Sequence, residues 1–295
     1  MENIKKCIIC AEEGKILFKM EDYTVRKCCQ CDLSWVEEVF EESILKEKDY
    51  YWARDFFVKN EKLLRDFSSN EVKEIIKLLK FKTLAGLKWL DIGSGIGYMI
   101  SEARKLGAEV TGIEINKDTA ELVRKREDLN VLHTSIKECN LPENSFNVIT
   151  IFDVLEHLLD PEEALKKANF LLKTGGLLAV EVPDDKSLFR KISYFLHDAS
   201  KGKINTFIRH AFHKHPGGHR IAYSKKSLNI LLEKHRFKVF HTGKTMIPYA
   251  LFIDETIRNK KFFSKIFYFT VSSAIYFLSI LTGTQNRIKL YAKKI

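Results

Sequence analysis

The sequence predicts an α/β protein built on a doubly wound, largely parallel sheet. Short apolar segments alternate with helical segments between residues 88 and 182. Within them, Lys88–Tyr98 (KWLDIGSGIGY) reads as a buried strand ending in an acid, then a glycine turn, then the start of a helix. Val148–Phe152 reads as an apolar strand, as expected of a central parallel strand covered on both faces. Such βαβα alternation is typical of doubly wound sheets.

Local sequence signals indicate where the elements of this alternation begin and end. Gly107 is expected to end the helix that follows the glycine turn. Asp160 and Pro161 are typical of a helix N-cap followed by the first helical position. Gly175–Gly176 is expected to end that last helix. We expect strands at 88–91, 109–114, 131–133, 148–152 and 177–182, and helices at 96–106, at 118–126 and from 161 onward.

The three glycines of the turn each favour a small-molecule site. Gly93 can take a backbone angle that a side chain would forbid, and Gly95 would let a ligand approach the main chain. Gly97 would let the new helix lie close to the strand. The helix N-terminus and the turn amides then favour an anionic group such as a carboxylate. The third glycine comes one residue earlier than in G-x-G-x-x-G, so an ordinary strand-to-helix turn remains the alternative for this stretch alone.

Composition and charge restrict the class of protein. The chain has 295 residues and is 45% hydrophobic, enough for one large and one small domain. Residues 183–295 contain 22 Lys and Arg against 6 Asp and Glu, whereas residues 1–182 contain 27 against 33. The basic part favours a phosphate-bearing partner, and a solvated surface without a partner is the alternative. Met1–Lys6 is polar and no apolar run follows, so we expect no signal peptide. Five of the six cysteines lie within the first 31 residues, which argues against a disulfide scaffold in a chain of this size and favours a reducing, cytoplasmic setting.

The cysteines near the N-terminus indicate a metal site. Two C-x2-C pairs, 17 residues apart, consist of Cys7, Cys10, Cys28 and Cys31. Four thiolates at this spacing predict a closed, structural zinc site in a zinc ribbon, with short strands at 15–20 and 23–27. So small a ribbon has too little core to fold without its metal. Cys29 is the alternative to Cys28, and Cys139 is expected to be a buried apolar residue.

Residues 36–80 are charged and predicted to be helical. Apolar residues recur at 72, 75, 76 and 79, the stripe of an amphipathic helix. An aromatic cluster precedes it, formed by Tyr50, Tyr51, Trp52, Phe56 and Phe57. The segment is either a lid over the pocket or a helix packed on the main sheet, and the pattern favours the packed helix.

Four motifs, in order, resemble those of class I S-adenosylmethionine-dependent methyltransferases. They are the glycine turn Leu90–Gly97, the acid Glu114 placed 23 residues after Asp91, the LPENSFNVI stretch Leu141–Ile149, and the FDVLEHL stretch Phe152–Leu158. The last is similar to the DVLEH signature of the branch that includes quinone and other small-molecule O-methyltransferases. The resemblance covers residues 85–182 well and His219–Phe240 more loosely. A zinc ribbon before such a domain resembles sugar C-methyltransferases and methyltransferases of bacterial surface-polysaccharide clusters.

The resemblance implies a seven-stranded Rossmann-like methyltransferase sheet and a bound S-adenosylmethionine. Glu114 would hold the ribose hydroxyls, and Asp91 the ammonium or the sulfonium field. Two departures from the family are Asn147, which replaces an aspartate, and the lack of a clear acid for the adenine amino group. The implied cofactor residues are Asp91, Gly93, Ser94, Gly95, Gly97, Glu114, Ile115, Ser135, Ile136 and Phe152.

Methyl transfer needs alignment of the two substrates and, for a hydroxyl acceptor, a base. Glu156 and His157 follow the fourth strand and face the same crevice, so His157 is the first candidate base and Glu156 its neighbour. A role in shaping the pocket wall is the alternative. His219, in the expected insertion after strand five, is a second candidate. His213 and His215 are interpreted as surface or substrate-facing residues.

The C-terminal part contains a charge-free segment, Ile266–Leu281, with Lys and Arg on both sides. It is interpreted as a helix packed on the sheet or a helix lying in a membrane interface, with anionic lipid as the partner. A transmembrane span is disfavoured, because Ile288–Ala292 resembles the last strand of the family and must return to the sheet.

These observations predict three domains and one leading function. The expected ranges are a zinc ribbon at 1–40, a helical linker or lid at 41–80, and a methyltransferase domain at 81–295 with insertions at 183–222 and 245–285. The function is methyl transfer to a small molecule, sugar or lipid-linked glycan, in the cytoplasm or peripherally on the inner membrane face. The alternatives are an RNA methyltransferase, disfavoured by the missing N/D-P-P-Y/F signature, and a non-catalytic cofactor-binding protein.

Overall fold

The protein folds into two compact units whose segments alternate along the chain. The computed structural model describes residues 4–39, 56–205, 208–209, 212, 218–257 and 262–295. The first unit comprises Met1–Phe40, Val182–Ile230 and Thr242–Lys289, and the second comprises Glu41–Glu181, Leu231–His241 and Leu290–Ile295. The domain boundaries expected from the sequence stay a prediction.

A seven-stranded sheet forms the centre of the second unit. Its order is β10-β11-β8-β7-β4-β5-β6, and β4 pairs in parallel with both β5 and β7. The β5–β6 and β7–β8 pairs are also parallel. The strands are β4 (Lys88–Ile92), β5 (Glu109–Glu114), β6 (Val131–His133), β7 (Phe146–Phe152), β8 (Leu172–Pro183), β10 (Phe237–Thr245) and β11 (Arg287–Lys294). The predicted fold class is confirmed, as is the return of Ile288–Ala292 to the sheet.

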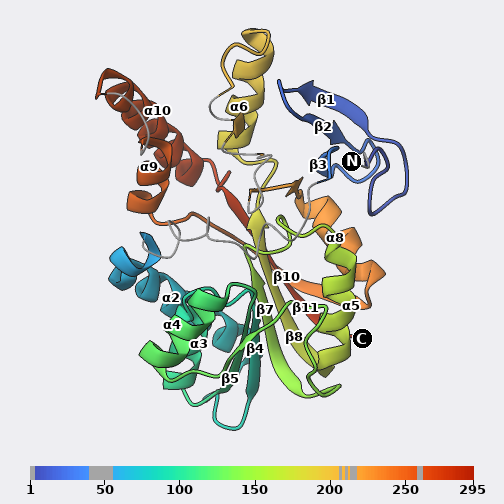
Figure 1. Ribbon diagram of the computed structural model, residues 1–295, viewed down its shortest axis with the longest axis vertical. Coiled ribbons are helices and arrows are strands. Elements are labelled where there is room, and N and C mark those ends of the chain that lie inside the picture. Colours follow the sequence, from blue (N-terminus) through green and yellow to red (C-terminus); the bar gives the residue numbers. More distant parts are fainter. Residues whose placement is uncertain (1–3, 40–55, 206–207, 210–211, 213–217, 258–261) are drawn as a thin grey trace. The chain divides into compact units, whose positions relative to one another are not determined.

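Helices cover both faces of this sheet, with α2, α3 and α4 on one face and α5 on the other (Figure 1). Asp160 caps α5 by accepting the N–H of Glu163 at 3.0 Å, and Pro161 is the first helical residue, as predicted. The helices are α2 (Glu61–Leu79), α3 (Tyr98–Lys105), α4 (Lys117–Glu127) and α5 (Pro161–Leu171), while α8 (Lys225–Lys234) runs from the first unit into the second.

The amphipathic stripe of α2 packs on the sheet. Val72 and Ile75 are fully buried in one core cluster with Trp89 and Ala103. The packed-helix interpretation is therefore confirmed for α2. Residues 40–55, which contain most of the expected aromatic cluster, lie outside the described residues.

The expected end of α5 is wrong. The helix ends at Leu171, and β8 begins at Leu172 and runs through Gly175 and Gly176. The pairing of β7 with β8 shifts from Phe146–Leu172 to Val148–Leu177, so extra residues of β8 are accommodated there. Gly175 has a φ of 74°, which glycine tolerates. The glycines therefore form an irregularity inside a strand rather than a helix stop.

The first unit contains a four-stranded antiparallel sheet of order β1-β2-β3-β9. The two strands expected in the ribbon are confirmed, but β3 and β9 were not anticipated. Phe18 and Val25 of the ribbon share a core with Ile208 and Phe212, so the ribbon does not have a core of its own. The strands are β1 (Lys15–Lys19), β2 (Thr24–Lys27), β3 (Ser34–Val36) and β9 (Ile221–Ala222).

Three further helices belong to the first unit: α6 (Leu188–Ala199), α9 (Tyr249–Ile257) and α10 (Phe262–Leu281). Phe252 of α9 packs edge to face on Phe189 of α6 and lies 5.4 Å, centroid to centroid, from Tyr276 of α10. The charge-free segment of the sequence therefore lies within one long helix that packs on α9 and α6.

Candidate functional site

The carboxyl ends of four parallel strands carry the candidate site in the second unit. Asp91 lies in β4, Glu114 ends β5, Phe152 ends β7, and Glu181 lies opposite Phe152 on β8. Parallel strands place these ends at one edge of the sheet, where open α/β sheets bind ligands. Asp91, Glu114 and Glu181 are all buried. Glu181 was not anticipated, and a lone acid near the end of an apolar strand is the signal that could have found it.

The glycine turn has the conformation that the sequence predicts. Gly93 has a φ of 73°, and a Cβ atom there would lie 2.3 Å from Val154 Cγ2. Gly95 has a φ of 49°, and a Cβ atom there would meet no atom within 4 Å, so space for a ligand exists beside the main chain. The prediction that Gly97 lets the new helix lie close to the strand is wrong. A Cβ atom at Gly97 would lie 2.6 Å from Val123 of α4, so the close neighbour is α4 and not the strand.

Glu114 is held in place at the end of β5 by backbone N–H groups. Oε2 accepts the N–H of Gly95 at 2.9 Å, and Oε1 accepts the N–H of Asn116 at 2.8 Å. The backbone N–H of Ile115 also interacts with this carboxylate, so backbone donors occupy most of its lone-pair positions. Burial raises the pKa of Glu114 above its usual range, and the backbone N–H groups oppose that shift. This arrangement fits the two neighbouring hydroxyls of a ribose.

Most backbone N–H groups of the glycine turn already donate hydrogen bonds to other groups of the protein. The N–H groups of Gly93 and Ser94 both donate to the carbonyl of Ile113 at 2.9 Å, and the N–H of Gly95 donates to Glu114. An anionic group would therefore have to use the first turn of α3 instead. The Ser94 side chain is buried, and its Oγ has no hydrogen-bond partner among the described residues.

The pKa of Asp91 is strongly raised by its surroundings. Its Oδ1 accepts a 2.6 Å hydrogen bond from Thr150 Oγ1, and Thr150 Oγ1 in turn accepts the indole N–H of Trp89 at 3.0 Å. Burial raises the pKa of Asp91 to about 7 despite the Thr150 hydrogen bond, and the nearby Glu114 contributes in the same direction. Thr150 was overlooked, although a hydroxyl inside an otherwise apolar strand is a readable signal.

The predicted adenine contacts lie after β5 and β6. Ile115 directly follows Glu114 and is half-buried, and Ile136 is buried. Ser135 Oγ donates to Glu138 Oε2 at 3.0 Å, which places an acid beside it in the segment where the resemblance implies one. Cys139 is buried, as expected. The adenine-binding role of these residues stays a prediction.

The two candidate catalytic residues after β7 lie close together. Glu156 is buried, and its Oε1 lies 4.0 Å from His157 Nε2, too long for a hydrogen bond. The His157 main-chain N–H donates to the Val154 carbonyl at 3.0 Å. His219 belongs to the first unit, so its relation to the other two stays a prediction. His213 and His215 lie outside the described residues.

Asn147, the departure from the family pattern, has a structural role. Its Oδ1 accepts the main-chain N–H of Lys88 at 3.0 Å and the ammonium of Lys173 at 3.1 Å. The amide therefore joins the beginnings of β4, β7 and β8, far along the strands from their carboxyl ends. We conclude that this substitution does not alter the candidate site.

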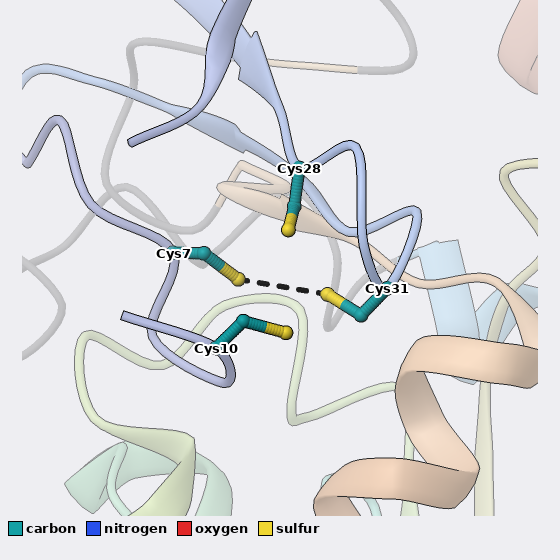
Figure 2. A group of neighbouring side chains, drawn as sticks. All are labelled: Cys7, Cys10, Cys28 and Cys31. Carbon is teal, nitrogen blue, oxygen red and sulfur yellow. Dashed lines mark hydrogen bonds between the residues drawn. The ribbon is translucent and has the colours of Figure 1, made fainter. Parts of the chain in front are cut away.

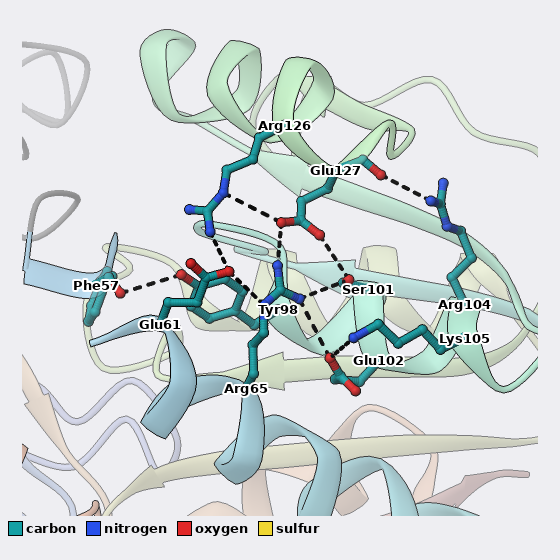
Figure 3. Close-up of polar contacts among 10 residues, drawn as sticks. All are labelled: Phe57, Glu61, Arg65, Tyr98, Ser101, Glu102, Arg104, Lys105, Arg126 and Glu127. Carbon is teal, nitrogen blue, oxygen red and sulfur yellow. Dashed lines mark hydrogen bonds and ion pairs between the residues drawn. The ribbon is translucent and has the colours of Figure 1, made fainter. Parts of the chain in front are cut away.

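A polar network fixes the helix that follows the glycine turn. Arg65 of α2 lies over the ring of Tyr98, 4.6 Å from its centroid, and donates to Ser101 Oγ at 3.1 Å. Ser101 donates to Glu127 of α4 at 3.0 Å, and Arg65 also pairs with Glu127. The network joins α2, α3 and α4 through Glu61, Arg65, Tyr98, Ser101, Glu102, Arg126 and Glu127 (Figure 3).

We expect Glu127→Gln to lower the free energy of unfolding by about 1–3 kcal/mol, because it removes the charge of one of the three carboxylates, with Glu61 and Glu102, that pair with the partly buried Arg65. Urea unfolding measures this. Lys62→Gln, which breaks an exposed ion pair with Asp66 on the same helix, is the control and should change stability by less than about 0.5 kcal/mol. Equal effects of the two substitutions would contradict the role given to the network.

Four cysteines form the candidate metal site of the first unit (Figure 2). The Sγ atoms of Cys7, Cys10, Cys28 and Cys31 all lie within 4.8 Å of one another. The Cys7 and Cys31 sulfurs are 3.6 Å apart, near the ~3.8 Å that separates thiolates bound tetrahedrally to zinc at ~2.3 Å. Cys29 is exposed and outside the group. The residues thus fit a closed four-thiolate zinc site.

The two C-x2-C turns have the same backbone conformation. The N–H of Ala11 donates to the Cys7 carbonyl at 2.9 Å, and the N–H of Asp32 donates to the Cys28 carbonyl at 3.2 Å. Ala11 and Asp32 both have positive φ values, 58° and 64°. The hydrogen bond with Cys31 lowers the pKa of the Cys7 thiol to about 5. Two equivalent turns presenting sulfurs to one point are what a shared ion requires.

Asp185, just after β8, connects the ribbon to the segment that follows. Its buried carboxylate accepts hydrogen bonds from Lys27 Nζ at 3.1 Å and Ser34 Oγ at 3.2 Å, and from the hydroxyl of Tyr194 on α6. Burial and the neighbouring Asp185 raise the pKa of Tyr194 well above its usual range. No local pattern indicates this contact, since its members are far apart along the chain.

Comparison with protein families finds one matching domain. A family model described as a methyltransferase domain matches residues 63–242, more than half of the chain. The match includes the glycine turn, Glu114, and Glu156–His157, and it begins after the ribbon.

Curated relatives match over a shorter range. A ubiquinone biosynthesis O-methyltransferase of Nitrosococcus oceani is 38% identical over 100 residues, which cover 32% of this chain and 42% of the relative. One of Actinobacillus pleuropneumoniae is 31% identical over 109 residues, covering 34% and 47%. The chain thus spans less than half the length of these relatives.

Solved structures share the fold. A SAM-dependent methyltransferase from Thermotoga maritima aligns with a TM-score of 0.52 and 20% identity, covering 83% of this chain and 99% of that one. Another, from Archaeoglobus fulgidus, aligns with a TM-score of 0.50 and 21% identity, covering 81% and 99%. Identities this low support the fold alone.

Proposed function

The chain belongs to the family of methyltransferase domains, in the class that uses S-adenosylmethionine, and we propose that it methylates a small-molecule acceptor. Within this class the proposed acceptor is a sugar or a lipid-linked glycan intermediate. The observation that carries the proposal is the pair of acids, Asp91 and Glu114, on adjacent strand ends beside the open turn at Gly95. The cytoplasm is the proposed location, in agreement with six free cysteines.

Each residue of the site would have a different role in binding S-adenosylmethionine. Glu114 accepts hydrogen bonds from the ribose hydroxyls with its carboxylate. Asp91, once ionised, offsets the positive charge of the ammonium or sulfonium group. Thr150 holds the Asp91 carboxylate in place through its 2.6 Å hydrogen bond. The open side of Gly95 lets the cofactor approach the main chain.

His157 is the proposed general base when the acceptor is a hydroxyl. The cofactor supplies a methyl group on a positively charged sulfur, which is a good leaving group. The protein must then align the acceptor oxygen and take up its proton. The buried carboxylate of Glu156, 4.0 Å away, favours the protonated imidazole. That curated relatives are named O-methyltransferases supports a hydroxyl acceptor.

We expect His157→Ala to lower kcat by about 10²–10⁴-fold, the usual contribution of a general base, while the Kd for S-adenosylmethionine stays within twofold. Transfer of a labelled methyl group to the acceptor identified below, together with calorimetry, measures both. His133→Ala removes an exposed histidine from β6 and is the control. If His157→Ala weakens cofactor binding as much as turnover, His157 belongs to the pocket wall and not to the chemistry.

A methyl-transfer screen tests the acceptor class. Purified protein with labelled S-adenosylmethionine is incubated with a cell-envelope extract and, separately, with bulk RNA. We expect label in the small-molecule and lipid fractions of the extract. Label in RNA alone would replace the proposed acceptor by nucleic acid, and cofactor binding without transfer to either fraction would favour a non-catalytic binding protein.

A further inference from the structure

The outward side of α10 is unusually apolar. Of the seventeen large apolar residues that are exposed in the described chain, eight lie on this one helix. They include Ile266, Phe267, Phe277, Leu278 and Leu281, with exposed fractions from 48% to 81%. A contiguous apolar surface of this kind marks a binding surface rather than ordinary solvent-facing structure.

The opposite, buried side of α10 is comparatively polar. Ser272, Ile275, Tyr276 and Ser279 recur at helical spacing and are the buried residues among the side chains of this helix that the structure describes. Leu281 comes nine residues after Ser272, two and a half turns, and so lies on the opposite side. A helix suited to water has the reverse pattern, with its apolar stripe inward. Small hydroxyl residues inside and large apolar residues outside are typical of helices that contact lipid.

The two ends of the segment that contains α9 and α10 lie next to each other within the first unit. Ile247 donates its N–H to Asn286 Oδ1 at 3.4 Å, and Lys244 Nζ donates to the Gly283 carbonyl at 2.9 Å. Both ends of the α9–α10 segment therefore lie on the same side of any surface that it meets. The segment can enter a membrane interface from one side without crossing the bilayer.

The charges around this segment favour an anionic surface. Lys265 is exposed on α10, and Lys191, Lys201 and Lys203 are exposed on or just after α6, which packs on α10. The exposed acid on α6 is Asp198, whose negative charge partly offsets these lysines. Residues 183–295 as a whole hold 22 Lys and Arg against 6 Asp and Glu. Two copies of so basic a part would repel each other, whereas anionic headgroups attract it.

We propose that α10 docks this protein onto an anionic phospholipid surface, with its outward apolar side in the interface and the surrounding lysines on the headgroups. The helix lies along the membrane and does not span it, because both ends of the α9–α10 segment stay on one side and the nine residues of α9 are too few to cross back. Apolar contact and charge act together, as stable interfacial binding requires. The docking does not depend on the proposed methyl transfer, and it is tested without any acceptor.

Flotation of the full chain with vesicles tests this docking. We expect the protein to float with vesicles of phosphatidylcholine containing one-third phosphatidylglycerol, and at least tenfold less with phosphatidylcholine alone. Rising salt should weaken the binding of the unchanged protein, since salt screens the lysines. Phe267→Ser with Leu278→Ser should reduce partitioning at least tenfold.

A matched pair of substitutions separates docking from general loss of apolar surface. Phe81→Ser with Leu106→Ser removes the same residue types at exposed fractions of 45% and 43%, outside α10, and should leave flotation unchanged. Thermal unfolding confirms that both double variants fold. Three results would overturn the proposal. The first two are no flotation at low salt and equal flotation with neutral vesicles. The third is that the protein forms a concentration-dependent dimer instead of binding vesicles, and that Phe267→Ser with Leu278→Ser dissociates this dimer.

Discussion

Asp91→Asn is expected to weaken the binding of S-adenosylmethionine by about 100-fold, or roughly 2.7 kcal/mol. Asparagine keeps the shape of the side chain and an oxygen that can accept the hydrogen bond from Thr150. What it removes is the negative charge that would face the cation of the cofactor. Because Asp91 is buried, water cannot replace that charge. Calorimetric titration of both proteins at neutral pH measures the difference.

Asp91 should also make the binding of S-adenosylmethionine depend on pH. Burial raises the pKa of Asp91 to about 7, and a cation binds the ionised form. Below this pKa, affinity for S-adenosylmethionine should rise by about tenfold per pH unit, with release of up to one proton, and it should level off above it. Asp91→Asn should remove this dependence. Titration in buffers of different ionisation enthalpy counts the protons.

The stability of the cofactor-free protein should change in the opposite direction. The folded pKa of Asp91 lies above the value of 3.8 for an unperturbed aspartate, so between about pH 4 and 7 the folded state holds a proton that the unfolded state has lost. Raising pH through this window favours the unfolded state. Burial raises the pKa of Glu114 as well, which adds to this trend. The unfolding temperature should therefore fall as pH rises, while the increase caused by the cofactor grows.

A matched control identifies the charge as the cause. Asp128→Asn makes the same chemical change at a fully exposed residue after α4 and should leave affinity and its pH dependence unchanged. Binding by the unchanged protein that is independent of pH between 5.5 and 7.5 would falsify the assignment of the cation to Asp91. Retention of full affinity by Asp91→Asn would do the same.

The sheet was predictable because its signals are local. The bounds of β5 agree with the sequence since Gly107 precedes an apolar run that ends at Glu114. The start of β8 was not predictable in this way, because glycine is typical both of helix ends and of irregularities within strands. Only pairing with β7 decides between them, and that pairing is a property of the folded sheet.

The candidate site was predictable as a set of residues but not as a network. The spacing of Asp91, the glycines and Glu114 is a local pattern that the resemblance makes specific. Thr150 acts on Asp91 from a neighbouring strand, and their contact depends on the register of β4 with β7. The pairing of β3 with β9 joins segments that are almost two hundred residues apart, and no local pattern encodes it.

The second large effect is expected at the zinc site. Cys28→Ser should lose one zinc ion per chain and destabilise the first unit, because structural zinc contributes on the order of 10 kcal/mol to small domains. The observed loss should be smaller than in an isolated ribbon, since Phe18 and Val25 also pack on Ile208 and Phe212. Metal analysis and thermal unfolding measure the two effects.

Cys29→Ser is the control for this experiment, because Cys29 is the adjacent cysteine and is exposed. It should keep one zinc ion and the unfolding temperature of the unchanged protein. The Asp185 contacts with Lys27 and Ser34 join the ribbon to the segment after β8, so loss of zinc should also expose that segment to protease. If Cys29→Ser lost the metal while Cys28→Ser kept it, the second C-x2-C turn would be misassigned. If the unchanged protein itself held no zinc, the four thiols would serve as a packed cluster without an ion, and the symmetry of the two turns would need another cause.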